Sequence, residues 1–155
     1  MAIDHSALRK VALFESLLPE HLKLVAGIVE EKQYPPSTVI CKDGDVADRF
    51  FFIVAGKVRI SKHIPGLGEE ALAILEPGDY FGEMALIDES PRSADAIANT
   101  TVVLGTIAKA TFEDLLFMNK DLAYDMLWTF VRTLSSRLRD ANEKMRAFLA
   151  MAGKF

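Results

Sequence analysis

The chain is poor in cysteine and histidine, and it has no long apolar run. Its one cysteine, Cys41, cannot form a disulfide within the chain, so we expect a reducing, cytoplasmic location. The three histidines, His5, His21 and His63, lie far apart, which disfavours a metal centre built from clustered histidine and carboxylate ligands. No stretch approaches the roughly 18 consecutive apolar residues of a membrane helix, so no membrane partner is expected.

What the chain does contain is typical of a globular protein. Half of its 155 residues are hydrophobic and 26% are charged, a balance that favours one folded domain over 1–155 rather than disorder. The formal net charge of -4 disfavours a nucleic-acid-binding surface.

Helical periodicity marks the two ends of the chain. Apolar residues recur at helical spacing over Ser6–Phe14, and Pro19 suits the first turn of a second helix, so 1–31 is predicted to hold N-terminal helices. The region 110–155 is predicted to be helical again. Thr111 could cap a short helix there, and a long helix follows from about Asp121 to about Ala150.

Between 32 and 109 the pattern changes to short runs rich in Val, Ile and Phe, with glycines between them. Such runs predict an antiparallel sandwich or a small barrel. The expected strands are Thr38–Cys41, Arg49–Ala55, Lys57–Ile64, Glu70–Leu75, Asp79–Phe81, Ser93–Asn99 and Thr101–Ala108.

The long C-terminal helix carries a heptad pattern. Its apolar seam is Leu127, Val131, Leu134, Leu138, Ala141, Met145 and Phe148. Steps that alternate between 4 and 3 residues are typical of a coiled coil, so we expect a homodimer through 127–148. The alternative is a helix that packs on its own barrel.

The most informative stretch is Phe81–Ala94. Gly82 lets a ligand approach the backbone, a short helix starting there would present free N–H groups, and Arg92 could form a two-pronged bond with an anion. Glu83 would repel an anion, and makes sense only if it accepts a hydrogen bond from another part of the ligand, such as a sugar hydroxyl. The alternative is an acidic surface loop that contains an arginine by chance.

This stretch resembles the phosphate-binding cassette of cyclic-nucleotide-binding domains. The nine-residue step from Glu83 to Arg92, with Pro91 before the arginine, is similar to that cassette, and so is the order of helices, strands and long helix. The resemblance implies an α+β fold. An eight-stranded antiparallel β-barrel or jelly roll of the double-stranded β-helix type over 32–109, with the cassette at 81–94, would be flanked by N-terminal helices and a long C-terminal helix.

The resemblance also assigns roles. Arg92 would bind the cyclic phosphate, Glu83 would accept from the ribose 2′-hydroxyl, and the backbone N–H groups of Gly82, Met84 and Ala85, with the Ser93 hydroxyl, would complete the site. Possible base contacts are Ile60, Leu75 and Asn142. For Ile60 and Leu75 core packing is an equal alternative, and for Asn142 a solvated helix face. The expected ligand is cAMP: serine at 93 is compatible with cAMP, although it does not exclude cGMP. No metal is expected.

We therefore expect a regulatory sensor that signals occupancy through its C-terminal helix, with no catalytic residues. An enzyme of the cupin type would need the clustered metal ligands that this sequence lacks. Two alternatives stay open: a ligand-free interaction module of the same fold, and the sensor fragment of a transcription regulator. Because no recognition helix follows the long helix in this sequence, direct nucleic-acid binding by this chain is not expected.

Overall fold

A computed structural model describes residues 5–153. Contacts divide the chain into two compact units, with the boundary between Met118 and Asn119. The first unit holds all of the strands and the shorter helices, and the second is built on one long helix. The single domain expected over 1–155 stays a prediction.

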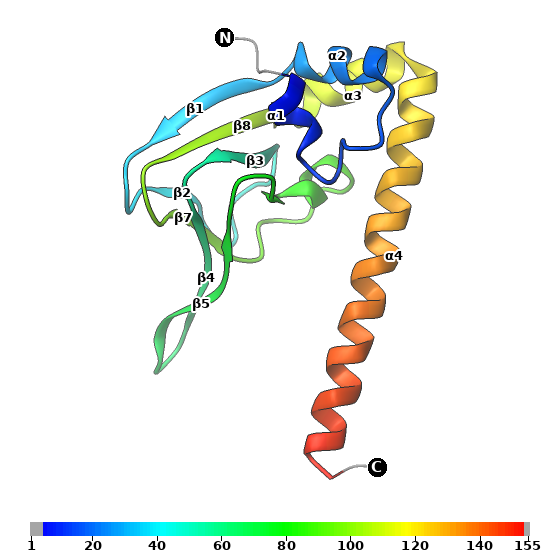
Figure 1. Cartoon of the computed structure of the whole chain (residues 1–155). Coiled ribbons are helices and arrows are strands. Elements are labelled where there is room, and N and C mark those ends of the chain that lie inside the picture. Colours follow the sequence, from blue (N-terminus) through cyan, green and yellow to red (C-terminus); the bar gives the residue numbers. More distant parts are fainter. Residues whose placement is uncertain (1–4, 154–155) are drawn as a thin grey trace. The chain divides into compact units, whose positions relative to one another are not determined.

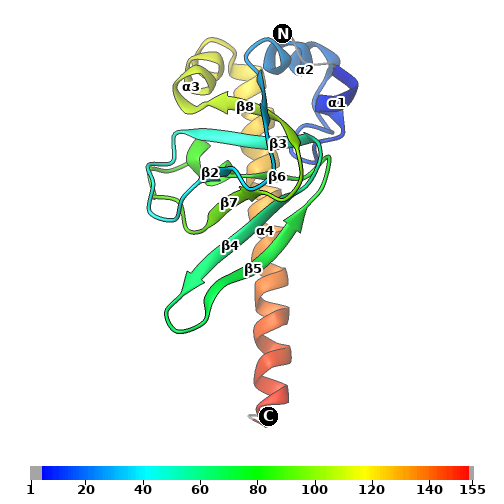
Figure 2. The same ribbon diagram turned by 90° about the vertical axis from the view of Figure 1, so that its left-hand side faces the viewer.

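The strands form two antiparallel four-stranded sheets (Figures 1 and 2). The first has the order β1-β8-β3-β6 and the second β2-β7-β4-β5. Their bounds are β1 Glu30–Tyr34, β2 Val39–Cys41, β3 Arg49–Ala55, β4 Val58–Ile64, β5 Gly68–Leu75, β6 Tyr80–Phe81, β7 Asp95–Ala98 and β8 Val102–Ala108. This arrangement confirms the predicted jelly roll of eight strands, although the two sheets do not join into a closed barrel.

The helices are α1 His5–Arg9, α2 Pro19–Ala26, the short 3-10 helix η1 Glu83–Leu86, α3 Lys109–Met118 and α4 Lys120–Met151. Pro19 opens α2 as predicted. The long helix α4 spans 32 residues without a break, close to its expected bounds. Among residues 5–153, no helix has both the length and the apolarity that crossing a bilayer requires.

The first helix is shorter than the periodicity predicts. It ends at Arg9 rather than Phe14, and the chain continues in tight turns such as the one closed by the Phe14 N–H and the Val11 carbonyl, at 2.9 Å. Val11, Leu13 and Phe14 are all fully buried. A regular helix would place Val11 and Leu13 on opposite faces, whereas the turns bury both.

Strand β1 was missed by the sequence analysis, which assigned its first two residues to the helical region 1–31. Its residues Glu30–Tyr34 are mostly exposed and show no apolar run. The strand lies at a sheet edge and pairs only with β8, in a register that sets Glu30 opposite Thr106 and Tyr34 opposite Val102. Backbone pairing with a buried neighbour, rather than side-chain burial, makes this segment a strand.

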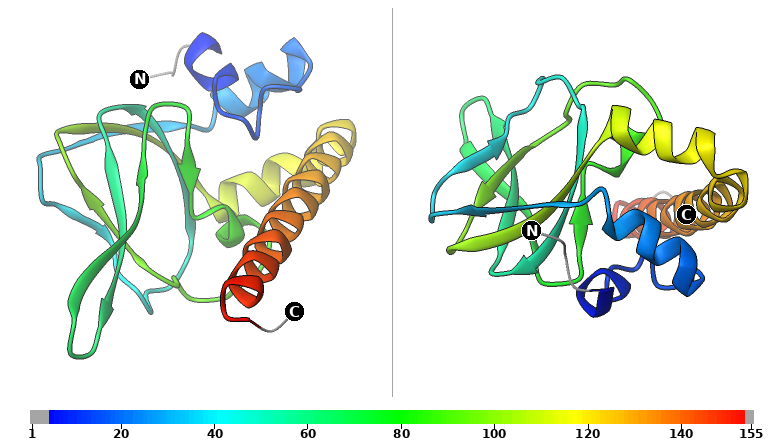
Figure 3. Two further views of the ribbon diagram at one scale, coloured as in Figure 1. Left: turned by 60° about the horizontal axis from the view of Figure 1, so that its bottom comes forward. Right: turned by 90° about the horizontal axis from the view of Figure 1, so that it is seen from above.

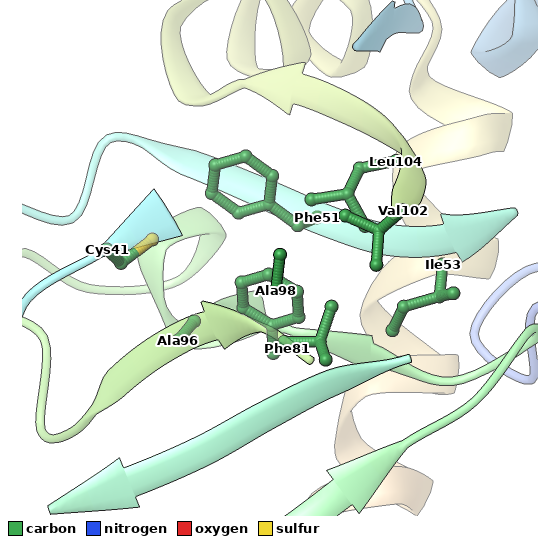
Figure 4. Close-up of a cluster of buried hydrophobic side chains, with 9 residues drawn as sticks. Cys41, Phe51, Ile53, Phe81, Ala96, Ala98, Val102 and Leu104 are labelled. Atoms are coloured by element: carbon green, nitrogen blue, oxygen red, sulfur yellow. The ribbon is translucent and has the colours of Figure 1, made fainter. Parts of the chain in front are cut away.

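Strand β3 is buried on both faces, and this explains its continuous apolar run. Phe51 and Ile53 point into the cluster between the two sheets (Figure 4). Phe50 and Phe52 alternate with them and meet Phe14 at ring distances of 5.8 and 6.3 Å. The inner cluster consists of Cys41, Phe51, Ile53, Val58, Phe81, Ala96, Ala98, Val102 and Leu104.

Gly105 in β8 should tolerate no side chain. A Cβ atom there would overlap the Phe52 ring, so Gly105→Ala should destabilise the protein by about 1–3 kcal/mol through overpacking. Gly27→Ala is the matched control. Its φ is -67° and the nearest atom would lie 3.4 Å from the new Cβ, so stability should stay within about 1 kcal/mol and can rise. Urea unfolding of both variants measures the difference, and equal midpoints would contradict the packing argument.

Candidate functional site

The predicted cassette begins at Phe81, the last residue of β6, and the chain turns sharply at Gly82. This glycine has a φ of +76°, a left-handed conformation that side chains rarely adopt, and it is the N-cap of η1. A Cβ atom at this position would collide with the guanidinium of Arg92. Glycine at 82 therefore makes the turn possible and also leaves room for the arginine.

Arg92 is held in place by other parts of the first unit. Its Nη2 donates to the Arg49 carbonyl at 2.6 Å, and its guanidinium carbon lies 5.7 Å from the centre of the Phe51 ring. Its backbone N–H donates to the Asp45 carbonyl at 2.8 Å, and its own carbonyl accepts from the Gly44 N–H at 2.7 Å. The Asp43–Asp45 turn and strand β3 thus fix the arginine before any ligand arrives.

Two neutral groups contact the Arg92 guanidinium: the Arg49 carbonyl and the Phe51 ring. A partly buried guanidinium loses part of its hydration, and an anionic ligand would compensate for that loss. The arrangement is that of an anion site.

Glu83 lies in the same cassette and is only 6% exposed. It begins η1, directly after Gly82. A buried carboxylate is stable only when hydrogen-bond donors surround it, and it offers acceptors alone. Glu83 therefore adds to the site an acceptor that suits a hydroxyl group.

The backbone donors of the cassette are partly engaged. The Ala85 N–H donates to the Gly82 carbonyl at 3.0 Å, and this is the first hydrogen bond of η1. The N–H groups of Glu83 and Met84 precede that bond, at the start of the short helix. Ala85 can serve a ligand only by sharing its N–H or by opening the turn. Because η1 has only four residues, its dipole is small, so the charge of a bound anion would have to be balanced mainly by Arg92.

A cavity of about 290 Å³ opens beside these groups. The structure brings together at its wall Ile60, Gly82, Glu83, Met84, Ala85, Arg92 and Ser93, seven of the nine predicted site residues. Leu75 instead packs against the inner apolar cluster. Asn142 lies on the exposed surface of α4, in the second unit. The contacts of Leu75 and Asn142 with a base stay predictions.

Other cavity residues were not foreseen as site residues. Cys41, Ala47, Asp88, Ser90 and Ala96 line the same space, and sequence spacing gave no signal for the residues outside the cassette. Burial raises the pKa of the Cys41 thiol and the nearby Asp45 and Asp48 add to this, while the Arg92 guanidinium acts in the opposite direction. Cys41 is therefore a neutral, weakly reactive wall residue rather than a nucleophile.

The part of the chain from 5 to 153 contains no group of three or more histidine, cysteine or carboxylate residues that could hold a metal ion. The site's chemistry therefore consists of one cation, one buried acid, a few backbone donors and apolar walls. Together with the jelly roll, these are the features of a domain that binds a small anion with hydroxyl groups.

Comparison with known proteins identifies that class. The sequence profile of the cyclic nucleotide-binding domain matches residues 31–119, more than half of the chain. This chain belongs to the cyclic nucleotide-binding domain family, as the cassette resemblance implied. Domains of this family are regulatory modules.

Among curated relatives, the cyclic AMP receptor protein of Thermus thermophilus is 32% identical over 130 residues, which cover 84% of this chain and 58% of that protein. The cAMP-dependent protein kinase regulatory subunit of Colletotrichum orbiculare is 33% identical over 109 residues, 70% of this chain and 27% of that subunit. The chain thus corresponds to between about a quarter and three fifths of these two relatives' length.

Solved structures agree with the fold. The catabolite activator protein of Thermus thermophilus superimposes with a TM-score of 0.77 and 30% identity, covering 88% of this chain and 62% of that one. The regulatory domain of Toxoplasma gondii PKA, solved with cAMP, gives a TM-score of 0.66 and 31% identity, and the match covers 72% of this chain and 42% of that one. The N-terminal domain of a Streptomyces coelicolor transcriptional regulator gives a TM-score of 0.78 and 28% identity, and the match covers 90% of this chain and 94% of that one.

Proposed function

We propose that this chain is a cAMP sensor whose ligand occupies the cavity beside the cassette. The observation that carries the proposal is Arg92, a guanidinium that lines the cavity and is oriented there by a neutral backbone carbonyl. A cyclic phosphodiester carries one negative charge, which one arginine can match with a charge-assisted pair of hydrogen bonds. We propose no chemical reaction: the bound state itself is the signal.

Glu83 supports a ribose rather than a simple anion. Inorganic phosphate would meet Arg92 but would bring its charge close to a buried acid. A ribose 2′-hydroxyl donates to Glu83, while the phosphate stays with Arg92. The pair thus selects a ligand that carries a negative charge and a hydroxyl donor at fixed separation.

The base would lie against the apolar wall formed by residues such as Ile60, Cys41 and Ala96. We favour adenine because relatives named for cAMP occur among both the receptor proteins and the kinase subunits. Ser93 at the wall is compatible with this choice. Guanine, and hence cGMP, is the alternative, and a direct titration with both nucleotides separates them. A cytoplasmic location stays a prediction.

The first prediction concerns Arg92. Arg92→Ala should weaken cAMP binding by about 2–5 kcal/mol, because it removes the charged partner of the phosphate. Isothermal titration with cAMP and cGMP measures the change. Arg59→Ala is the matched control: this arginine lies in the same unit but pairs with Glu69 at 2.7 Å and does not line the cavity. Wild-type protein that binds neither nucleotide at millimolar concentration would refute the sensor proposal, and an unchanged affinity for Arg92→Ala would move the phosphate elsewhere.

A second prediction tests Glu83 by changing the ligand and the protein together. For the wild type, 2′-deoxy-cAMP should bind about tenfold to a hundredfold more weakly than cAMP, as expected for a lost hydrogen bond to a charged group. In Glu83→Ala this ratio should fall close to one. Asp88→Asn, which alters another acid of the cavity wall, should keep the wild-type ratio. A ratio that survives in Glu83→Ala would show that another group contacts the 2′-hydroxyl.

We further propose that two copies pair through α4. Much of its heptad seam is exposed: Leu127, Val131, Leu138, Met145 and Phe148 are 55–70% accessible. A second copy would cover this stripe with its own.

The charges beside the seam favour a parallel pair. Arg137 and Lys144 lie on one flank of the stripe, and Ser135 and Asn142 lie on the other. In an antiparallel pair like flanks meet, so the two cations of one copy would face those of the other. In a parallel pair each cationic flank meets the neutral flank of its partner. Asn142 would then be an interface residue, whether or not it also contacts the base.

Leu138→Glu should therefore produce a monomer, because it places a charge in the middle of the apolar stripe. Light scattering coupled to size-exclusion chromatography gives the mass directly. Ser136→Glu adds the same charge on the side of α4 away from the seam and should leave a dimer. A wild-type protein that is monomeric at high concentration would contradict the pairing.

A further inference from the structure

Lys109 stands in an electrostatically unfavourable place. It is the first residue of α3, and the first turn of this helix has no acidic residue. A cation at a helix N-terminus opposes the helix dipole and is usually avoided there. A residue that breaks a local rule in this way points to a role elsewhere in the structure.

That role is visible in the contacts of Lys109. Its Nζ donates to the Asp88 carbonyl at 3.2 Å, and its side chain is only 20% exposed. The same ammonium lies 3.9 Å from the Glu113 carboxylate, one turn further along α3. The backbone N–H of Lys109 donates to the Asp48 carbonyl at 2.9 Å.

The contacts of Lys109 with Asp88 and Asp48 connect it to residues at or next to the cavity. Asp88 lines the cavity. Its own N–H donates to the Met84 carbonyl at 2.9 Å, so Asp88 is hydrogen-bonded to the last turn of η1. Asp48 directly precedes Arg49, whose carbonyl holds the Arg92 guanidinium. Helix α3 and η1 are neighbours, which the view from above shows (Figure 3). Lys109 therefore connects the start of α3 to two segments beside the anion site: the end of η1 at Asp88 and the start of β3 at Arg49.

We propose that Lys109 is a positioning residue that anchors the far end of the cassette to α3 and so couples ligand occupancy to that helix. The coupling rests on the proposed binding of a cyclic nucleotide, whereas the anchor itself exists without ligand. Lys109 neither lines the cavity nor needs to touch the ligand. It acts by fixing the Asp88 carbonyl, and thereby the segment that carries Glu83 and leads to Arg92.

Three variants separate this role from its alternatives. Lys109→Met keeps the apolar stem and removes the ammonium. Lys109→Arg keeps a donor of the same charge and should rescue the anchor. Glu113→Gln removes the exposed acid partner and leaves the bond to Asp88 in place, so it tests whether the ion pair on α3 is the part that matters.

The first measurement is hydrogen exchange of the ligand-free protein. In Lys109→Met, peptides covering 84–90 and the first turn of α3 should exchange at least about threefold faster than in the wild type, because the anchor's stabilisation against local opening is lost. Lys109→Arg and Glu113→Gln should behave as the wild type. Unchanged exchange in Lys109→Met would overturn the anchor, whatever the protein binds.

The second measurement adds saturating cAMP. The wild type should gain protection in both the 82–94 segment and α3, and Lys109→Met should keep the first gain and lose most of the second. The dissociation rate of cAMP should rise about threefold to tenfold in Lys109→Met and return towards the wild-type value in Lys109→Arg. Equal protection of α3 in Lys109→Met and the wild type would overturn the coupling. If cAMP does not protect residues 82–94 in the wild type, the cyclic-nucleotide proposal is refuted. The anchor is then tested by the exchange of the ligand-free proteins alone.

Discussion

The candidate site depends on how the fold positions one half-buried guanidinium, that of Arg92. Three parts of the fold define the position of Arg92: a carbonyl of β3, the face of the Phe51 ring and two backbone hydrogen bonds with the 43–45 turn. None of these partners carries a negative charge. The structure thus orients the cation with neutral groups, and this preorganisation would favour an anionic ligand.

Strand β3 connects this site to the stability of the fold. Its Phe50 and Phe52 meet Phe14 on one face, while Phe51 stacks on Phe81, with ring centres 5.0 Å apart, on the other. The strand that holds Arg92 is therefore fixed by two layers of aromatic packing. A ligand that binds Arg92 meets a rigid support, so any movement that follows must occur in the cassette or in the segments joined to it.

The sequence allowed the cassette and most strands to be predicted because their signals are local. Glycines between short apolar runs, alternating apolar residues and the spacing from Glu83 to Arg92 can each be recognised within a few residues. Strand β1 could not be recognised, since its polar residues become a strand through pairing with β8, far away in the sequence. The same holds for Cys41 and the Arg49 carbonyl, which reach the site only through the tertiary fold.

The buried acid makes this a more selective site than its single cation would suggest. Arg92 alone would attract any small phosphate, with an affinity set largely by charge and screened by salt. In the proposed site, Glu83, buried at the same cavity wall, would disfavour every anion that lacks a hydroxyl in the right place. Selectivity would then arise from an acid and a cation at one cavity wall, with the acid placed by the turn at Gly82. A change that loosened this segment would weaken discrimination between ligands before it abolished binding.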